Sequence, residues 1–219
     1  LWCYLASEYV HFSTIAAGKF VSFLQNRTSV AVGMVLMLYG FWLLLNLLFK
    51  GSEYSFELLL ENLWWPGFSM TSPAMTARLL AAVQYDKTGI LLDIGHLFNA
   101  NPALSDEAAC LAFAHAMLDA HGSLCPRIRG MHLHGAATGC IVREMLASPL
   151  MLAADFPGRF ADAYDWVTRI DPHCPLLSPG VQELVSRVAP EYLVLELSGT
   201  DLAARRPGIM AQLAALRKE

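Results

Sequence analysis

Charged residues are scarce in this chain, and basic residues are fewer than acidic ones. Only 16% of the 219 residues are Asp, Glu, Lys or Arg, and the formal net charge is −4. No run of Lys and Arg stands out. Nucleic-acid binding draws most of its affinity from basic contacts with phosphate, so the composition speaks against a nucleic-acid partner. The apolar fraction of 55% excludes a disordered chain and allows a substantial hydrophobic core.

Cysteine is too scattered to form a recognisable framework. The five residues are Cys3, Cys110, Cys125, Cys140 and Cys174. The number is odd and no C-x-x-C pair occurs, which argues against a disulfide scaffold and against a zinc ribbon. Most of these thiols are expected to be small buried apolar groups. This usage fits a reducing compartment, and we expect a cytoplasmic protein.

Two further patterns are missing. No G-x-G-x-x-G or Walker loop occurs, so nucleotide binding lacks its usual sign. The first residues do not have the charged and apolar regions of a secretory signal. The chain begins with Leu1 rather than Met, and we expect its N-terminus to be missing or processed.

The segment 30–49 is the longest apolar run. It reads VAVGMVLMLYGFWLLLNLLF, has no charge, and is flanked by Arg27 and Lys50. Its length matches the roughly 20 residues that span a bilayer. The favoured interpretation is a helix packed on a sheet within an N-terminal region, residues 1–52. Membrane contact or a buried partner interface are the alternatives, since the segment has little of the polar face that a surface helix shows.

Residues 53–219 alternate between strand and helix patterns. Apolar runs with polar ends occur at 55–62, 89–96, 127–135 and 191–199, and helical patterns at 72–84, 105–122, 156–169 and 180–188. Ser72 and Pro73 mark the start of the first of these helices, and Ser105 the start of the second. This alternation predicts an α/β fold with parallel strands that are covered on both faces.

The polar strand ends favour one α/β architecture over another. Glu61, Asp93, His132 and Glu196 each lie at the carboxyl end of an apolar run. In a (β/α)8 TIM barrel these ends converge on one rim, whereas an open sheet usually gathers its ligand at a single switch point. We therefore predict a TIM barrel. Together with a possible earlier strand around His11, about five strands can be assigned, so the first strands of the barrel are expected to be absent from this chain.

The same strand ends predict a metal site. A mixture of carboxylate and imidazole ligands suits Zn²⁺, Mn²⁺, Fe²⁺ or Co²⁺ better than Mg²⁺ or Ca²⁺. The candidate ligands are Glu61, Asp93, His96, His132, Asp171, His173 and Glu196. His134 lies two residues after His132 and is expected to orient that ligand or to contact substrate. Trp64 and Trp65 follow Glu61, and they could form the wall of a substrate pocket.

Five short motifs carry a resemblance to a known family. In order they are LLLENLW, LLDIGH, MHLHG, DPH and LVLEL, within residues 53–200. They resemble the xylose isomerase-like TIM barrels, which include the AP endonuclease family 2 (endonuclease IV) type and sugar phosphate isomerases and epimerases. The resemblance implies that Glu61 is the bridging glutamate and that Asp171 and His173 serve a further metal. The histidines that the endonuclease type has on earlier strands have no clear match here.

The resemblance implies a divalent-metal enzyme with one to three ions, and we expect zinc or manganese. The favoured reaction is hydrolysis of a phosphoester in a small or medium-sized organic substrate, with Glu61 and Glu196 as catalytic residues. The cobamide-remodelling phosphodiesterase branch of the superfamily is one candidate. Isomerisation or epimerisation of a sugar or sugar phosphate is the alternative, and a degenerate barrel without catalysis is the second.

Overall fold

The computed structural model of the protein describes residues 40, 56–65, 67–147 and 151–217. They fall, apart from Gly40, in one compact unit, Ser55–Glu219. The predicted N-terminal region (residues 1–52) and its apolar segment 30–49 lie, again apart from Gly40, outside the described residues. In the portion of the chain that the structure describes, no helix has both the length and the apolar character needed to cross a bilayer.

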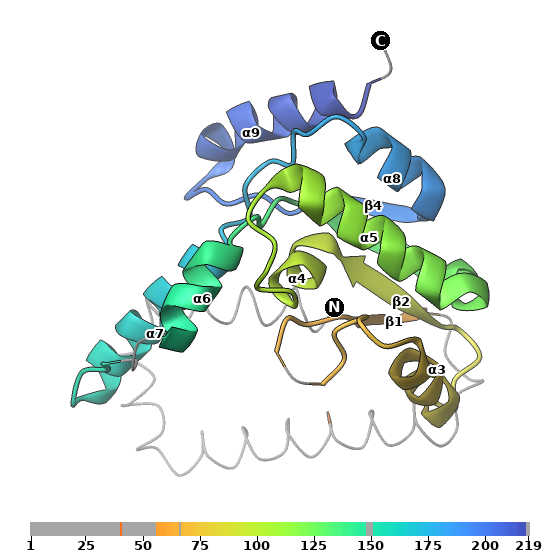
Figure 1. The fold of residues 1–219 in the computed structure, drawn as a ribbon, viewed down its shortest axis with the longest axis horizontal. Helices are drawn as coiled ribbons and strands as arrows, with labels where there is room; N and C mark the ends of the chain where they lie inside the picture. The colour runs from red at the N-terminus through yellow and green to blue at the C-terminus, as the bar shows by residue number, and fades with distance from the viewer. Residues whose placement is uncertain (1–39, 41–55, 66, 148–150, 218–219) are drawn as a thin grey trace. The chain divides into compact units, whose positions relative to one another are not determined.

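Strands and helices alternate along the described chain, as predicted (Figure 1). The strands are β1 (Leu58–Glu61), β2 (Thr88–Asp93), β3 (Ile128–Leu133) and β4 (Tyr192–Leu195). The helices are α3 (Pro73–Ala82), α4 (Ile94–Asn99), α5 (Glu107–His121), the 3-10 helix η1 (Gly122–Arg127), α6 (Gly139–Ala147), α7 (Phe156–Ile170), α8 (Val181–Val188) and α9 (Leu202–Ala215). The four predicted strands and four predicted helices are confirmed, and α4, α6 and α9 were not predicted.

Capping residues explain where the predicted helices begin. Ser72 accepts a hydrogen bond from the Met75 amide and Pro73 occupies the first turn of α3, as the sequence pattern indicates. The predicted cap of α5 is wrong by one residue. Asp106, rather than Ser105, accepts from the Ala109 amide at 2.8 Å. An aspartate carboxylate also interacts favourably with the positive end of the helix dipole, which favours Asp106 at this position.

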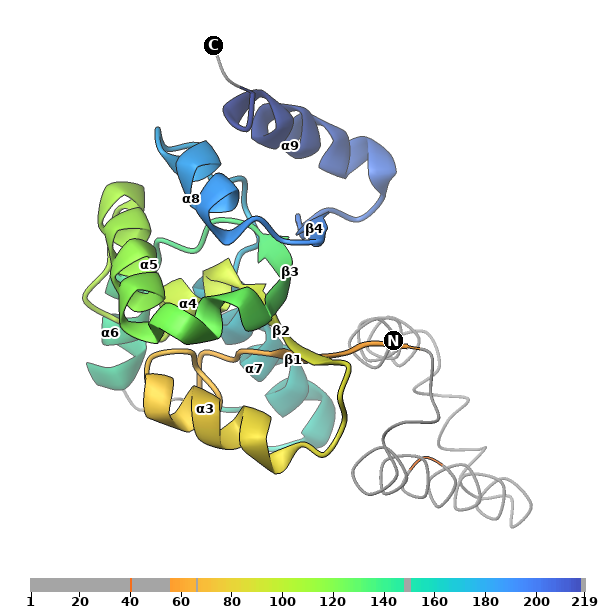
Figure 2. The same cartoon turned by 90° about the vertical axis from the view of Figure 1, so that its right-hand side faces the viewer.

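The hydrophobic core lies where the sheet packs with the helices α3, α4, α5 and α8, whose arrangement is drawn in Figures 1 and 2. Ile90 and Leu92 of β2 and Met131 and Leu133 of β3 point into this core and have no exposed surface. Alternate residues of a strand point to opposite faces, so Leu91 and His132 belong to the other face. That second face carries the polar residues at its carboxyl edge.

The predicted eight-stranded barrel is wrong. Within the described residues the sheet has four strands, all parallel, in the order β1-β2-β3-β4. The strands β1 and β4 form the two edges of this described sheet and do not pair with each other. The prediction failed because it assumed that polar residues at successive strand ends require a closed rim. An open sheet whose strands follow chain order also places those ends side by side, without a switch point.

Candidate metal centre

Four predicted ligands meet at the carboxyl edge of the sheet. Glu61 ends β1, Asp93 ends β2, His132 lies near the end of β3, and Glu196 follows β4. One ligand atom from each lies within 4.8 Å of the others. Because the four strands are parallel and adjacent, their carboxyl ends bring these residues together although they span 136 positions of the chain.

The imidazole of His132 lies at the centre of this group, which we call the first cluster (Glu61, Asp93, His132 and Glu196). Its Nδ1 is 3.5 Å from Oε1 of Glu61, 3.4 Å from Oδ2 of Asp93 and 2.6 Å from Oε2 of Glu196. Ligands placed about 2.05 Å from a tetrahedral zinc ion are about 3.3 Å apart. Two of the three separations are close to that value, so the donors fit around a single divalent ion.

Two atoms of the first cluster have unmet hydrogen-bonding capacity. Nδ1 of His132 and Oε2 of Glu196 are buried and have no hydrogen-bond partner among the described residues. They lie close to each other, but not in hydrogen-bond geometry. Buried polar atoms are normally satisfied, and a cation bound between the two would satisfy both. The donor set therefore fits a divalent metal ion.

The charges of the first cluster also favour a bound cation. Burial lowers the pKa of His132, but the carboxylates of Asp93, Glu196 and Glu61 more than reverse this effect and raise the pKa to about 12. Burial raises the pKa of Asp93, but the neighbouring imidazoles of His132 and His134 hold it far below its usual range. Three carboxylates gathered around one imidazole thus favour positive charge, which a divalent cation supplies.

A second cluster (His96, Asp171 and His173) forms around the Asp171 carboxylate. Oδ2 of Asp171 is 3.1 Å from Nε2 of His96 and 3.6 Å from Nε2 of His173. Asp171 follows α7, His96 lies in α4, and His173 belongs to the loop between α7 and α8. Burial lowers the pKa of His96, but Asp171 and Asp93 raise it to about 9. The predicted pair of Asp171 and His173 therefore lies beside His96, the histidine three residues after Asp93.

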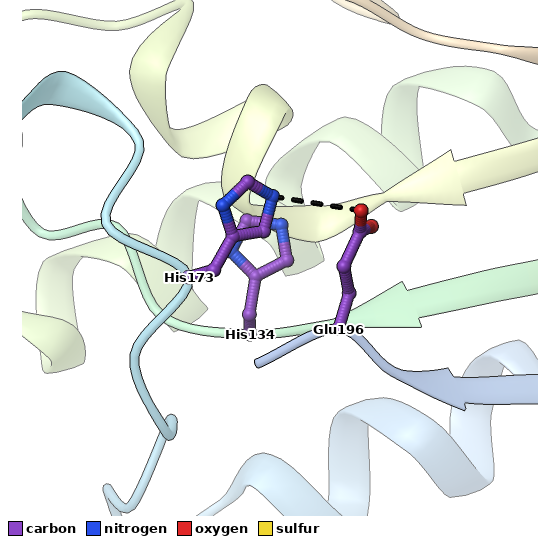
Figure 3. A group of neighbouring side chains, drawn as sticks. All are labelled: His134, His173 and Glu196. Atoms are coloured by element: carbon purple, nitrogen blue, oxygen red, sulfur yellow. Dashed lines mark ion pairs between the residues drawn. The ribbon is translucent and has the colours of Figure 1, made fainter. Parts of the chain in front are cut away.

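Glu196 connects the two clusters. Its Oε2 faces His132, and its Oε1 is 3.7 Å from Nε2 of His173, the ion pair drawn in Figure 3. His134, His173 and Glu196 form a further group whose ligand atoms lie within 4.8 Å of one another. The Glu196 and His173 side chains are 41% and 27% exposed, whereas Asp93 and Asp171 are buried. The site therefore opens to solvent beside Glu196 and His173.

The loop that carries His173 is held in an uncommon backbone conformation. His173 has a φ of 46°, in the left-handed region that only a small share of non-glycine residues adopt. Ser198 stabilises this conformation: its amide donates to the His173 carbonyl at 2.9 Å, and its hydroxyl donates to the Pro172 carbonyl at 2.8 Å. Strain of this kind concentrates at functional sites. The segment after Glu196 thus fixes the position of His173.

The sequence interpretation missed three buried polar residues that support the ligands: Asn62, Asn99 and Thr138. The Asn62 amide accepts from the Asp93 backbone N–H at 2.8 Å and donates to the Asp93 carbonyl at 2.9 Å. The backbone carbonyl of Asn62 accepts a hydrogen bond from Nδ1 of His96 at 2.8 Å. This contact turns Nε2 of His96 toward Asp171. The sequence contained a signal for Asn62, because this residue directly follows an apolar strand. A side-chain amide buried at the end of such a strand must find hydrogen-bond partners.

A second chain of hydrogen bonds holds Asp171. The Asn99 amide donates to Oδ1 of Asp171 at 3.3 Å, and the Thr138 hydroxyl is 2.8 Å from the Asn99 carbonyl oxygen. The same hydroxyl lies 2.5 Å from the Ile170 carbonyl. These contacts orient the Asp171 carboxylate, as partners of metal ligands commonly do.

The residues predicted to contact substrate, His134, Trp64 and Trp65, differ in their exposure to solvent. His134 is fully buried, and it contacts Asp93 rather than solvent. Trp64 and Trp65 lie in the loop after β1, with their rings edge to face and centroids 5.3 Å apart. Trp65 is 48% exposed, so it is available to a ligand approaching that loop.

Comparisons with models of protein families, with curated proteins and with solved structures returned no match. The resemblance of the five motifs to the xylose isomerase-like barrels therefore stays a prediction. The geometry of the two clusters is the basis for a functional proposal.

Proposed function

We propose that this chain is a divalent-metal-dependent hydrolase that cleaves a phosphoester of a small or medium-sized organic molecule. The observation that carries the proposal is the position of Glu196, whose two carboxylate oxygens face two different clusters of metal-type donors. A carboxylate between two cation sites suits two-metal phosphoester hydrolysis, in which a pair of nearby ions holds the attacking and leaving oxygens. Zinc and manganese suit the mixed imidazole and carboxylate donors.

The residues divide by cluster. Glu61, Asp93, His132 and Glu196 would hold one ion, and His96, Asp171 and His173 would hold a second ion, with Glu196 beside it. When bound, the ions would neutralise phosphoryl charge and make a coordinated water more acidic. Glu196 is the more exposed of the two predicted catalytic glutamates. It is therefore placed to take a proton from the attacking water, while Glu61 lies deeper in the first cluster.

The positions of the glutamates also bear on the isomerase alternative. That reaction needs two acids on opposite sides of a substrate carbon. Here the Glu61 and Glu196 oxygens both point to Nδ1 of His132, at 3.5 and 2.6 Å. Two carboxylates directed at one imidazole fit neighbouring ligands of one ion better than two acids on opposite faces of a sugar. This geometry supports hydrolysis over proton exchange between two faces of a substrate.

The test is metal content together with phosphoester cleavage in the purified full chain. Wild-type protein and His173→Ala would be loaded with Mn²⁺ or Zn²⁺, desalted, and assayed for metal by mass spectrometry and for hydrolysis of bis(4-nitrophenyl) phosphate. We expect two or more ions per wild-type chain, fewer in the variant, and a loss of hydrolysis of at least about 100-fold. His115→Ala is the matched control, because His115 lies on α5 and contacts Arg187 instead of the clusters.

Three outcomes would contradict the proposal. One ion per chain that His173→Ala does not affect, with solvent proton exchange into a ketose, would favour the isomerase. Normal metal content with no cleavage of any phosphomonoester or phosphodiester would remove the reaction but not the site. A chain that retains no metal would favour a protein without catalysis.

A further inference from the structure

His134 lies directly behind a ligand of the first cluster. Its ring is fully buried, and its Nε2 is 3.1 and 3.2 Å from the two carboxylate oxygens of Asp93. On its other side the ring lies against His173, with centroids 4.3 Å apart (Figure 3). A carboxylate only accepts hydrogen bonds, so Nε2 carries the proton and donates to Asp93.

The Asp93 carboxylate is held from two directions. Its Oδ1 accepts from the His96 backbone N–H at 2.7 Å and is the oxygen nearer to His134. Its Oδ2 faces Nδ1 of His132 at 3.4 Å. Oδ1 thus has two donors, whereas Oδ2, which also lies 3.2 Å from Nε2 of His134, is the oxygen directed at the first cluster. A histidine that fixes a ligand carboxylate in this way limits its rotation before a metal binds.

Gly95 provides the space that His134 occupies. A Cβ atom at position 95 would lie 1.9 Å from Cε1 and 2.4 Å from Nδ1 of the His134 ring, closer than atoms can approach. Gly95 lies in the first turn of α4 and does not have a positive φ, so its backbone does not need glycine. Glycine inside a helix costs about 1 kcal/mol relative to alanine. The need for space beside the His134 ring explains why glycine stands at this helical position.

We propose that His134 is a positioning residue, which orients the Asp93 carboxylate for the metal of the first cluster and which requires glycine at position 95. This inference rests on the proposed metal site. It assigns His134 a role behind a ligand, without contact with substrate. Loss of such an outer partner typically lowers metal affinity about 10–100-fold.

The first test compares two substitutions of His134 in the full chain. His134→Gln keeps an N–H donor near the position of Nε2, whereas His134→Leu fills similar space without a donor. Mn²⁺ affinity would be measured by competition with a chelating dye, and thermal stability by circular dichroism. We expect His134→Leu to lower the affinity of the first cluster about 10–100-fold. We expect His134→Gln to restore most of that loss at comparable thermal stability.

The second test is a double-mutant cycle between positions 95 and 134. Gly95→Ala should weaken metal binding in the wild-type background, because the new methyl group displaces the ring. In the His134→Ala background it should have little further effect, because the methyl group enters vacated space. Additive effects would overturn the proposed dependence on Gly95. If Gly95→Ala does not fold, the Gln and Leu comparison still decides whether His134 is a donor to Asp93.

The outcomes separate this inference from the proposed function. Wild-type protein that binds no metal overturns both. Wild-type protein that binds metal, with His134→Leu equal to wild type in affinity, overturns the positioning role alone. The role is also overturned if Gln and Leu lower the affinity equally, in step with a loss of thermal stability, because that pattern describes a residue needed only for packing.

Discussion

Metal affinity should rise with pH well above neutrality, because a proton on His132 competes with the metal. The pKa of His132 is raised to about 12, chiefly by the carboxylates of Asp93, Glu196 and Glu61, which outweigh the opposing effect of burial. Below that pKa the imidazole of the metal-free protein is protonated, and a protonated imidazole cannot bind a metal. Each ion that binds the first cluster must therefore displace one proton.

The expected magnitude follows from this competition. With one proton displaced, affinity rises tenfold per pH unit, so it rises about 100-fold, or about 2.7 kcal/mol, from pH 6 to pH 8. A histidine with an ordinary pKa of 6.5 would give only about a fourfold rise over the same range. Asp93 and Glu196 do not add to the pH dependence of affinity between pH 6 and pH 8. The pKa of each carboxyl is lowered from an ordinary value near 4, so both are already ionised in this range.

Calorimetric titration of the full chain with Mn²⁺ at pH 6, 7 and 8 would measure this dependence. Repeating the titration in two buffers of different ionisation enthalpy counts the protons released. If a second ion binds the second cluster, the pKa of about 9 at His96 predicts a second released proton. A rise of fourfold or less, or no proton release, would refute the argument that the carboxylates hold a proton on His132.

The remaining predictions concern stability and reactivity. Asn62→Ala removes two buried hydrogen bonds from the backbone N–H and C=O of Asp93, so urea unfolding should show a loss of about 1–3 kcal/mol. An unchanged free energy of unfolding would show that Asn62 does not join the two strands. Leu92→Ala creates a cavity in the core and should cost about 2–5 kcal/mol in the same assay; a loss below about 1 kcal/mol would contradict the packing. Cys110 has no exposed surface, and burial with Asp106 and Glu107 nearby raises its pKa to about 12. A thiol reagent at pH 8 should therefore modify the exposed Cys140 before Cys110, and modification of both at the same rate in folded protein would contradict the burial of Cys110.

Local patterns were sufficient for much of the secondary structure. The run that became β2 is apolar over its length, and Ser72 with Pro73 marks the start of α3 through contacts within one turn. The failures were also local. The helix α4 has six residues directly after a strand, and its start was interpreted as a continuation of that strand. Pro207 lies inside α9 and breaks the usual helical pattern there.

The identities of the candidate ligands were available from the chain itself. Parallel strands place their carboxyl ends on one edge whatever the wider architecture, so polar residues after apolar runs were expected to meet. That reasoning brought together Glu61 and Glu196, although they are distant in sequence. It did not depend on a closed barrel, and among the described residues the first cluster forms on an open sheet of four strands.

The sequence by itself determined the four described strands, four of the helices and the candidate metal ligands, because these depend on spacing along the chain. Only the tertiary structure decided that the described sheet stays open, since strand closure depends on pairing between distant segments. It also decided that His134 lies behind Asp93 beside Gly95, and that Glu196 faces two clusters. These roles depend on ångström-scale distances between elements, which residue spacing does not contain.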